Sequence, residues 1–210
     1  MILLFLGPPG AGKGTYSDII GERNGFTHVS SGDVCREAVA NGGKIGEQVA
    51  SYINKGQYVP DPIIIPLFEK KLKVLKNVIL DNFPGNLTQA KAVQGRIPIQ
   101  QVFYFYASMD VLMDRMSNRL TCKQCGAIFN IKNIPPKVEG KCDKCGGELY
   151  QRADQHLDVV KKRLETYEKE VLPLVDFYEA KKMLIRSESL PIEQVETVIK
   201  PIINYIQKHK

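Results

Sequence analysis

Residues 7–15 read GPPGAGKGT, a stretch in which four glycines surround a single lysine, Lys13. The apolar run before it, Ile2–Leu6, predicts a buried strand, and a helix is expected over about 13–22. Glycines between a strand and a helix let successive backbone N–H groups converge on one anion. The helix N-terminus adds partial positive charge, and Lys13 can reach the outer phosphates of a nucleotide. The segment therefore predicts a phosphate-binding loop, with a tight turn and a chance lysine as the alternative.

Four of the five cysteines form two CxxC pairs, Cys122/Cys125 and Cys142/Cys145. This pattern is typical of a tetrahedral zinc site, in which four thiolates leave no open position and the metal is structural. A segment of about 30 residues with little apolar content can use such a metal in place of a core. Disulfides are the alternative, and iron can also occupy four thiolates. Cys35 stands apart and is expected to be a small buried side chain rather than a reactive thiol.

Short apolar runs alternate with helical stretches along the chain. Continuous apolar runs are typical of strands covered on both faces of a parallel sheet, and the alternation implies a doubly wound α/β core with five parallel strands. The expected strands are Ile2–Leu6, 27–29, Val78–Asp81, 102–106 and 183–186. An amphipathic helix is expected from Leu157, interrupted or kinked at Pro173, and another over 192–206. Two segments fit the alternation poorly and look like insertions: 32–61, which is helical in pattern, and 120–151, which carries the CxxC pairs.

Charge and composition favour a globular protein with anionic partners. The net charge of +6 suits nucleic acid, acidic membrane or phosphorylated small molecules. Apolar residues make up 43% of the chain, enough for a sizeable core. No apolar run approaches the roughly 20 residues of a membrane span, so no membrane partner is expected. The apolar N-terminus lacks the basic leader and cleavage site of a signal peptide.

In the general P-loop pattern, Ser or Thr directly follows the lysine. Here Gly14 follows Lys13, and the hydroxyl residue, Thr15, comes one position later. In this respect GPPGAGKGT resembles the loop of adenylate kinases, within the nucleoside-monophosphate kinases. The resemblance continues in order along nearly the whole chain. It runs through HVSSGDVCRE (28–37), GQYVPD (56–61), LDNFPG (80–85), Gln89, DRMSNR (114–119), the cysteine segment, YQRAD (150–154) and Arg163.

This resemblance implies both an architecture and a reaction. The implied P-loop core comprises 1–29, 60–119 and 156–210, with a helical monophosphate-binding insert over 30–59 and a zinc-binding lid over 120–155. The implied reaction is reversible, magnesium-dependent transfer of the terminal phosphate of ATP to AMP, giving two ADP, with closure of both inserts. Such an enzyme is expected in the cytoplasm, whose reducing conditions disfavour disulfides.

Phosphoryl transfer between nucleotides needs alignment and charge neutralisation, because the attacking monophosphate oxygen is already anionic. By the resemblance, Lys13 holds the β- and γ-phosphates, Arg36 and Arg163 the monophosphate, and Arg119 and Arg152 the transferring group. The full catalytic set is Lys13, Arg36, Arg115, Arg119, Arg152 and Arg163. A solvated surface charge is the alternative for each arginine, and above all for Arg115.

The resemblance also assigns the nucleotide and magnesium ligands. The ATP site is Gly10, Ala11, Gly12, Lys13, Gly14, Thr15, Arg119, Ile128 and Phe129, the last two over the donor base. The AMP site is Ser31, Arg36, Gln57, Tyr58, Val59, Gly85, Gln89, Arg152 and Arg163. Magnesium is expected with ATP, held partly through water by Thr15, Asp33 and Asp81; for Asp81, a satisfied carboxylate at a strand end is the alternative. The three histidines show no spacing that indicates ligation or catalysis.

Gly85 marks a departure from the family pattern, because related chains read Asp-Gly-Phe-Pro-Arg where this chain reads Asp-Asn-Phe-Pro-Gly. The missing arginine would contact the phosphate of the monophosphate, and Lys91 and Arg96 are the nearest cations in the sequence. Our hypothesis is that the acceptor is held more weakly or with looser base choice.

Two other functions stay open at this point. One is a kinase for another monophosphate (UMP, CMP or GMP), with other triphosphates also open as donors. The second is a zinc-ribbon protein that binds nucleic acid. Against the second, Arg119 and Arg152 bracket the ribbon as a catalytic lid requires, and the ribbon lacks a string of aromatic residues for base stacking. No nucleic-acid partner is therefore expected, and the oligomeric state is open.

Overall fold

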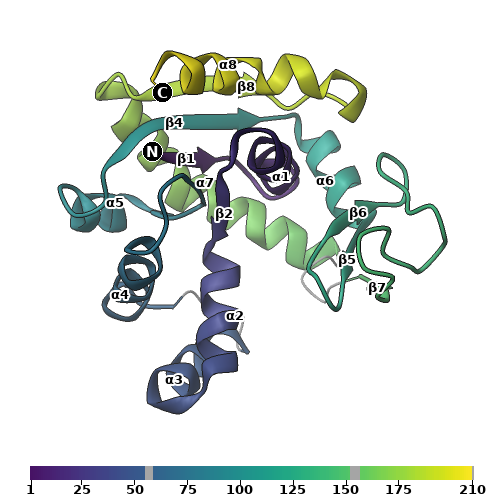
Figure 1. Ribbon diagram of the computed structural model, residues 1–210, viewed down its shortest axis with the longest axis horizontal. Coiled ribbons are helices and arrows are strands. Elements are labelled where there is room, and N and C mark those ends of the chain that lie inside the picture. The colour runs from purple at the N-terminus through teal and green to yellow at the C-terminus, as the bar shows by residue number, and fades with distance from the viewer. Residues whose placement is uncertain (55–58, 152–156, 210) are drawn as a thin grey trace. The chain divides into compact units, whose positions relative to one another are not determined.

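The structure is a computed structural model that describes residues 1–54, 59–151 and 157–209 (Figure 1). Five side chains in the first turns of helix α7 also lie outside the description, those at 157, 158, 162, 163 and 166. Strands and helices alternate in this order: β1 (Ile2–Leu6), α1 (Lys13–Asn24), β2 (Thr27–Ser30), α2 (Ser31–Asn41), α3 (Gly43–Ile53), α4 (Asp61–Leu72), β3 (Val78–Asp81), α5 (Leu87–Val93), β4 (Ile99–Tyr106), α6 (Met109–Ser117), β5 (Arg119–Cys122), β6 (Ile128–Asn130), β7 (Leu149–Tyr150), α7 (Leu157–Ala180), β8 (Leu184–Glu188), the 3-10 turn η2 (Ile192–Gln194) and α8 (Val195–Lys208).

Five strands form one sheet in the order β2-β3-β1-β4-β8. Strand β3 is parallel to both of its neighbours, and Asp81 at its end is in register with Phe5 of β1 and Ser30 of β2. In a parallel sheet the C-terminal ends of the strands share one edge, which is where ligands bind in folds of this kind. The predicted five-stranded parallel sheet flanked by helices is confirmed.

The strand β4 begins at Ile99, three residues before the predicted start at 102. Two glutamines hid this part of the strand from a search for apolar runs. Gln100 accepts a hydrogen bond from the backbone of Ile2, and the amide of Gln101 donates to the carbonyl of Met183. Polar side chains that satisfy backbone groups at strand ends therefore shifted the predicted boundary.

Helix α7 continues through Pro173, so of the two predicted outcomes the interruption is wrong, whereas the kink stays a prediction. A proline inside a helix removes one backbone hydrogen bond, which usually ends the helix. Here the apolar stripe around it is buried, with Val171, Leu174, Val175 and Tyr178 each at most 5% exposed. Burial of this stripe offsets the lost bond.

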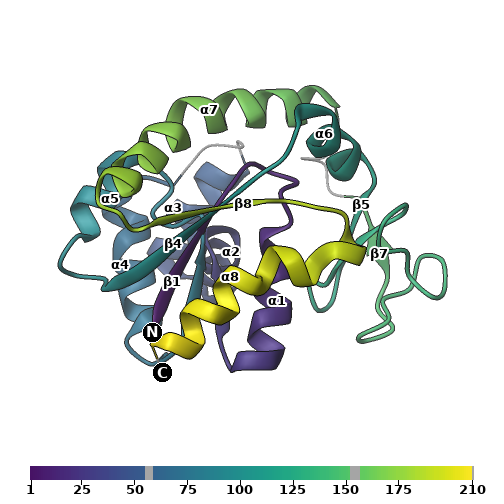
Figure 2. The ribbon, with the colours of Figure 1, turned by 90° about the horizontal axis from the view of Figure 1, so that it is seen from above.

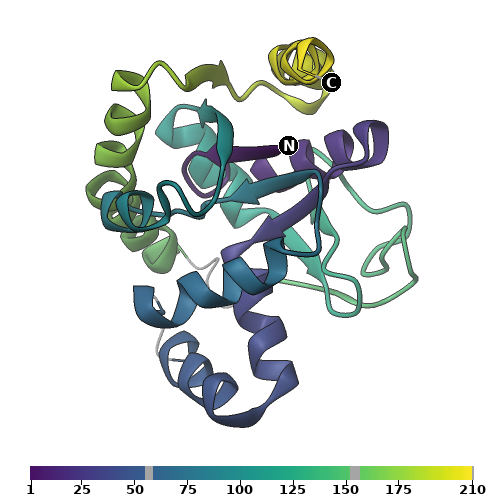
Figure 3. The same cartoon turned by 60° about the vertical axis from the view of Figure 1, so that its left-hand side comes forward.

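The chain separates into two compact units. The first comprises Met1–Leu6, Ser17–Phe103 and Glu170–Leu184. In its central strands, Leu3–Leu6 of β1 and Val78–Leu80 of β3 are apolar and fully buried, as expected for the interior of a parallel sheet. Helices α2 and α3 follow β2 directly. Figure 3 shows α3 beside α2, and α4 also contacts α2. The helical character predicted for 32–61 is thus confirmed over its described residues.

The second unit comprises Gly7–Tyr16, Tyr104–Lys169 and Ile185–Lys210. It contains the glycine loop, α6, a three-stranded antiparallel sheet in the order β6-β5-β7, and α8. Helix α8 lies along β8 (Figure 2), and the hydroxyl of Ser187 in β8 donates to the carbonyl of Val198 in α8. No helix in the described part of the chain is both long enough and apolar enough to span a bilayer. The division into a moving insert over 30–59 and a moving lid over 120–155 stays a prediction.

Candidate functional site

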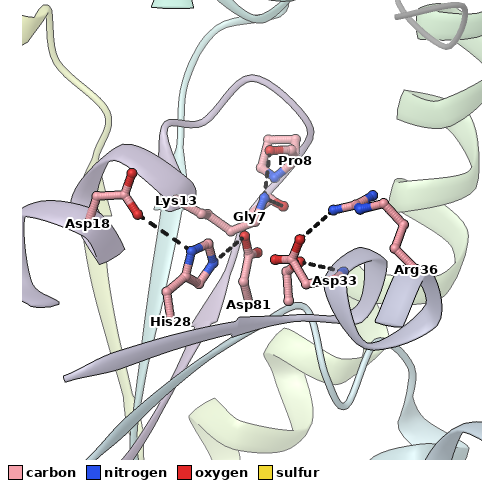
Figure 4. Close-up of polar contacts among 9 residues, drawn as sticks. Gly7, Pro8, Lys13, Asp18, His28, Asp33, Arg36 and Asp81 are labelled. Atoms are coloured by element: carbon pink, nitrogen blue, oxygen red, sulfur yellow. Dashed lines mark hydrogen bonds and ion pairs between the residues drawn. The ribbon is translucent and has the colours of Figure 1, made fainter. Parts of the chain in front are cut away.

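The glycine loop is closed by its own lysine. The ammonium of Lys13, at the start of α1, donates to the carbonyls of Gly7 at 2.8 Å and Pro8 at 3.1 Å (Figure 4). The backbone N–H of Ala11 also donates to the carbonyl of Pro8 at 3.1 Å. Lys13 is only 9% exposed. The cation is thus fixed against the loop, as a phosphate-binding lysine must be.

Two glycines in the loop are required by backbone geometry. Gly10 and Gly12 have φ of 87° and 79°, values that residues with a Cβ rarely adopt. A Cβ on Gly12 would also lie 2.9 Å from the ring of Tyr16. The conformation that turns backbone groups toward an anion therefore depends on glycine at these positions.

Arg115 in α6 is bonded within the protein rather than solvated. Its guanidinium donates to the hydroxyl of Ser189 at 2.6 Å and to the carbonyl of Leu190 at 2.9 Å. A longer contact of 3.5 Å reaches the carbonyl of Gly10 in the loop. The alternative of a free surface charge is wrong for Arg115, whereas its predicted direct role toward phosphate stays a prediction.

The four cysteines of the CxxC pairs come together in one cluster. Their sulfur atoms all lie within 4.8 Å of one another, and all five cysteines of the chain are free of disulfides. Both pairs form the same turn, because Gly126 donates to the carbonyl of Cys122 and Gly146 to that of Cys142. Hydrogen bonds from the backbone of Cys125 and Gln124 lower the pKa of Cys122 to about 6. Four converging sulfur donors fit a tetrahedral metal ion.

The lid segment has a small core of its own. Phe129 is 6% exposed and packs with Cys122, Cys142, Ala127 and Leu149. Ile128, beside it in β6, is half-buried, and Arg119 opens β5 opposite Asn130. The ring of Phe129 therefore stabilises the lid, and its predicted position over the donor base stays a prediction.

The lid segment is hydrogen-bonded to the C-terminal end of α6. The amide of Asn130 donates to the carbonyl of Arg115 at 3.1 Å, and the backbone of Ile131 donates to the carbonyl of Asn118 at 2.9 Å. Lys132 pairs with Asp114. The lid is thus connected through polar contacts to the helix that carries Arg115.

In the first unit, Asp81 contacts a histidine that sequence reasoning missed. The imidazole of His28 in β2 lies 3.3 Å from the carboxylate of Asp81 and 3.7 Å from that of Asp18 (Figure 4). Burial disfavours the charged imidazole, but the hydrogen bonds and negative charges of these two aspartates outweigh it and raise the pKa of His28 to about 9. No local sequence pattern signals His28, because only the pairing of β2 with β3 brings it to the strand that ends in Asp81.

Asp33 and Arg36 form an ion pair in α2. The Arg36 guanidinium donates to the carboxylate of Asp33 at 2.5 Å, and both side chains are more than half exposed. Partial burial opposes ionisation of Asp33, but the Ser30 hydroxyl and Arg36 outweigh it and lower its pKa. The hydroxyl of Ser30 caps α2 by accepting from the backbone of Asp33 at 3.0 Å. Ser31, the predicted ligand, is the first residue of the helix.

Gln89 is held from both ends. Its amide donates to Asp61 at 2.8 Å, and its carbonyl oxygen accepts from the backbone of Gly85 at 2.7 Å. The side chain is only 9% exposed. Of the two cations near this loop in sequence, Arg96 is paired with Glu69 at 2.7 Å and Lys91 is exposed.

Some predicted site residues cannot be placed in this arrangement. Gln57, Tyr58 and Arg152 lie outside the described residues, and Arg163 lies in α7 with its side chain outside the description. Val59, the described member of the predicted 57–59 segment, is buried.

A glycine loop between a parallel strand and a helix, with a lysine folded over it, defines a P-loop nucleotide-binding protein. The family model described as "Adenylate kinase" matches residues 5–183. The chain therefore belongs to the adenylate kinase family.

Relatives match over almost the whole chain. An adenylate kinase of Carboxydothermus hydrogenoformans is 40% identical over 216 residues, which cover 99% of this chain and 100% of the relative. One from Archaeoglobus fulgidus is 38% identical with complete coverage of both chains. One from Thermodesulfovibrio yellowstonii is 41% identical over 90% of this chain and 91% of the relative.

His28 is expected to make the stability of the fold depend on pH. Its pKa rises from 6.5 to about 9 on folding, so its contribution is complete below about pH 6.5 and is lost as the pH rises through about 9. Chemical unfolding at about pH 6, without added magnesium or nucleotide, should show the wild type more stable than His28→Gln by about 2–3 kcal/mol. The difference should shrink toward pH 9.5. A difference that stays constant across this range contradicts the assignment.

Proposed function

We propose that this protein transfers the terminal phosphate of ATP to AMP, reversibly and with magnesium, giving two ADP. The observation that carries this proposal is the match to the adenylate kinase family over residues 5–183. The relatives described above are named adenylate kinases, and their matches cover 90–100% of this chain. The glycine loop with Lys13 supplies the chemistry that such a reaction requires of the donor site.

The loop contributes positive charge without a catalytic base. The AMP oxygen that attacks is anionic, so the protein has no proton to remove and must instead reduce repulsion between two sets of phosphates. Lys13 and the N-terminal turn of α1 place positive charge at the loop. We assign the β- and γ-phosphates of ATP to this charge.

Arginines complete the neutralisation in this proposal. Arg36 and Arg163 are assigned to AMP, and Arg119 and Arg152 to the group in transfer, because guanidinium binds phosphate oxygens in pairs and stays charged. Arg36 is paired with Asp33. AMP phosphate would compete with that carboxylate for the same guanidinium.

Zinc is the metal proposed for the lid. Cys122, Cys125, Cys142 and Cys145 would hold it with four sulfur atoms, which suits a structural rather than a catalytic ion. The reducing cytoplasm that we propose as the location of the protein keeps such thiols available. Magnesium bound with ATP neutralises phosphate charge, and the residues proposed to hold it and its waters are Thr15, Asp33 and Asp81.

The two other functions considered from sequence are not favoured by the comparisons. Full-length relatives named adenylate kinases leave no specific observation in support of a nucleic-acid-binding ribbon. The departure at Gly85 still bears on how tightly and how selectively the acceptor is held.

The reaction can be tested with matched nucleotide pairs. Zinc-loaded protein should form ADP from ATP and AMP more efficiently than from other combinations of four triphosphates and four monophosphates. Lys13→Ala should lower kcat/KM for ATP by about a hundredfold or more, because a fixed charge at the phosphates is removed. Lys200→Ala, an exposed lysine on α8, is the control and should leave activity unchanged. Lack of phosphate exchange with every pair would refute the proposed function.

Restoring the arginine at position 85 tests how the acceptor is held. A Cβ at Gly85 would lie 3.0 Å from the carbonyl of Asn82, so a small local shift accompanies any side chain there. Gly85→Ala introduces the same shift without a charge and is the matched control. Relative to it, Gly85→Arg should lower KM for AMP about tenfold or more, through charged hydrogen bonds to phosphate, and should sharpen the preference for AMP. Equal acceptor affinity and base preference in the two variants would show that the missing arginine has no consequence.

The lid metal can be identified by analysis of the purified protein. One zinc per chain is expected, and Cys142→Ser should lose it, because three thiolates bind zinc far more weakly. Ligation is worth roughly 10–16 kcal/mol in small zinc modules, so the variant should also unfold at lower temperature. Cys35→Ala changes the cysteine outside the cluster and should retain the metal. Iron in place of zinc, or full metal content in Cys142→Ser, would overturn this assignment.

A further inference from the structure

Ser189, the first residue after β8, is buried and makes three short polar contacts. It is 5% exposed. Its hydroxyl oxygen lies 2.6 Å from a guanidinium nitrogen of Arg115, 2.8 Å from the hydroxyl of Tyr16 and 3.0 Å from the carbonyl of Ala11 in the glycine loop. These residues belong to the same compact unit. The contacts therefore join the loop, α1, α6 and the segment after β8.

The chemistry of the partners fixes the direction of each hydrogen bond. A guanidinium can only donate, so Arg115 donates to Ser189, and a carbonyl can only accept, so Ser189 donates to Ala11. The single proton of Ser189 is then used, and Tyr16 must donate to the remaining lone pair of the serine oxygen. Every hydrogen-bonding position of the Ser189 hydroxyl is occupied.

The bond to Ala11 orients a peptide in the loop. A trans peptide is planar, and its C=O and N–H point in opposite directions. Ser189 holds the carbonyl of Ala11 toward the interior, so the N–H of Gly12 in the same peptide faces the other way. Gly12 lies in the segment that receives phosphate in the proposed function, and backbone N–H groups are what such a loop offers to an anion.

Tyr16 and Arg115 hold Ser189 in place for this bond. The ring of Tyr16 packs against Phe105, with ring centroids 4.9 Å apart. Arg115 also donates to the carbonyls of Ser189 and Leu190, at 3.3 Å and 2.9 Å, so it fixes the backbone as well as the hydroxyl. The serine cannot turn away from Ala11 without breaking bonds to both partners.

We propose that Ser189 is a positioning residue for ATP, which together with Tyr16 and Arg115 holds the Ala11–Gly12 peptide with its N–H toward the bound phosphates. This inference rests on the proposed function, because it names how the donor site of that reaction is kept in shape. Ser189 acts through the loop and does not itself touch the nucleotide.

Ser189→Ala tests the proposal. Loss of the hydroxyl frees the Ala11 carbonyl and should raise KM for ATP about tenfold, while KM for AMP changes by less than about twofold. The matched control is Ser187→Ala, which removes another buried serine hydroxyl two residues earlier, in β8; it is bonded to Val198 at 3.1 Å and not to the loop. It should leave KM for ATP within about twofold of the wild type.

Tyr16→Phe provides a second variant that keeps the ring and removes only the hydroxyl. It should raise KM for ATP in the same direction, and its effect should not add to that of Ser189→Ala, because both act on one carbonyl. Calorimetric titration with ATP alone should show the same losses of affinity, so the inference is tested even if no ADP forms. Wild-type affinity for ATP in both single variants, or an equal loss in Ser187→Ala, would overturn it.

Discussion

The proposed ATP site depends on a loop with few side chains, which must keep its carbonyl oxygens away from an anion. Carbonyl oxygens repel phosphate, and a glycine-rich backbone has little steric resistance to turning them outward. Lys13 secures the carbonyls of Gly7 and Pro8, and Ser189 secures that of Ala11. The same cation that is assigned to the nucleotide thus also shapes the loop. The sheet and helices around it serve to bring these groups to one place.

The cysteine cluster and the aspartates proposed for magnesium are built in different ways. The lid has few apolar residues, and its small cluster around Phe129 is built on the cysteines themselves. Two identical turns, each closed by a glycine, direct the four sulfur atoms inward. The aspartates assigned to magnesium are instead each paired with a basic residue, Asp81 with His28 and Asp33 with Arg36. The lid site gathers like groups, whereas each of these aspartates contacts a basic residue.

Sequence patterns predicted the elements that depend on residues close together in the chain. Continuous apolar runs identified the buried strands, and β1 and β3 have the predicted bounds. The spacing of the cysteines predicted their cluster because ligand geometry is encoded in the CxxC turns. The predicted strand β4 was too short because Gln100 and Gln101 are polar and bond to distant backbone groups. An interruption at Pro173 was predicted because the sequence does not show that burial of the surrounding apolar stripe lets the helix continue.

Contacts between distant residues explain what sequence analysis missed in the site. Nothing near His28 shows that a strand pairing brings it beside Asp81, 53 residues away. Ser189 carries no local pattern either, since a serine after a strand is common on surfaces. Arg115 was identified within DRMSNR, but its hydrogen bonds to Ser189 and Leu190 depend on the fold.

The separation of 178 positions between Ala11 and Ser189 has a consequence for synthesis of the chain. A ribosome makes the glycine loop long before its serine partner. Until the segment with Ser189 emerges, β1 and α1 can form, but the carbonyl of Ala11 lacks this hydrogen bond. The proposed ATP-binding loop therefore takes its final shape only when that later segment contacts it.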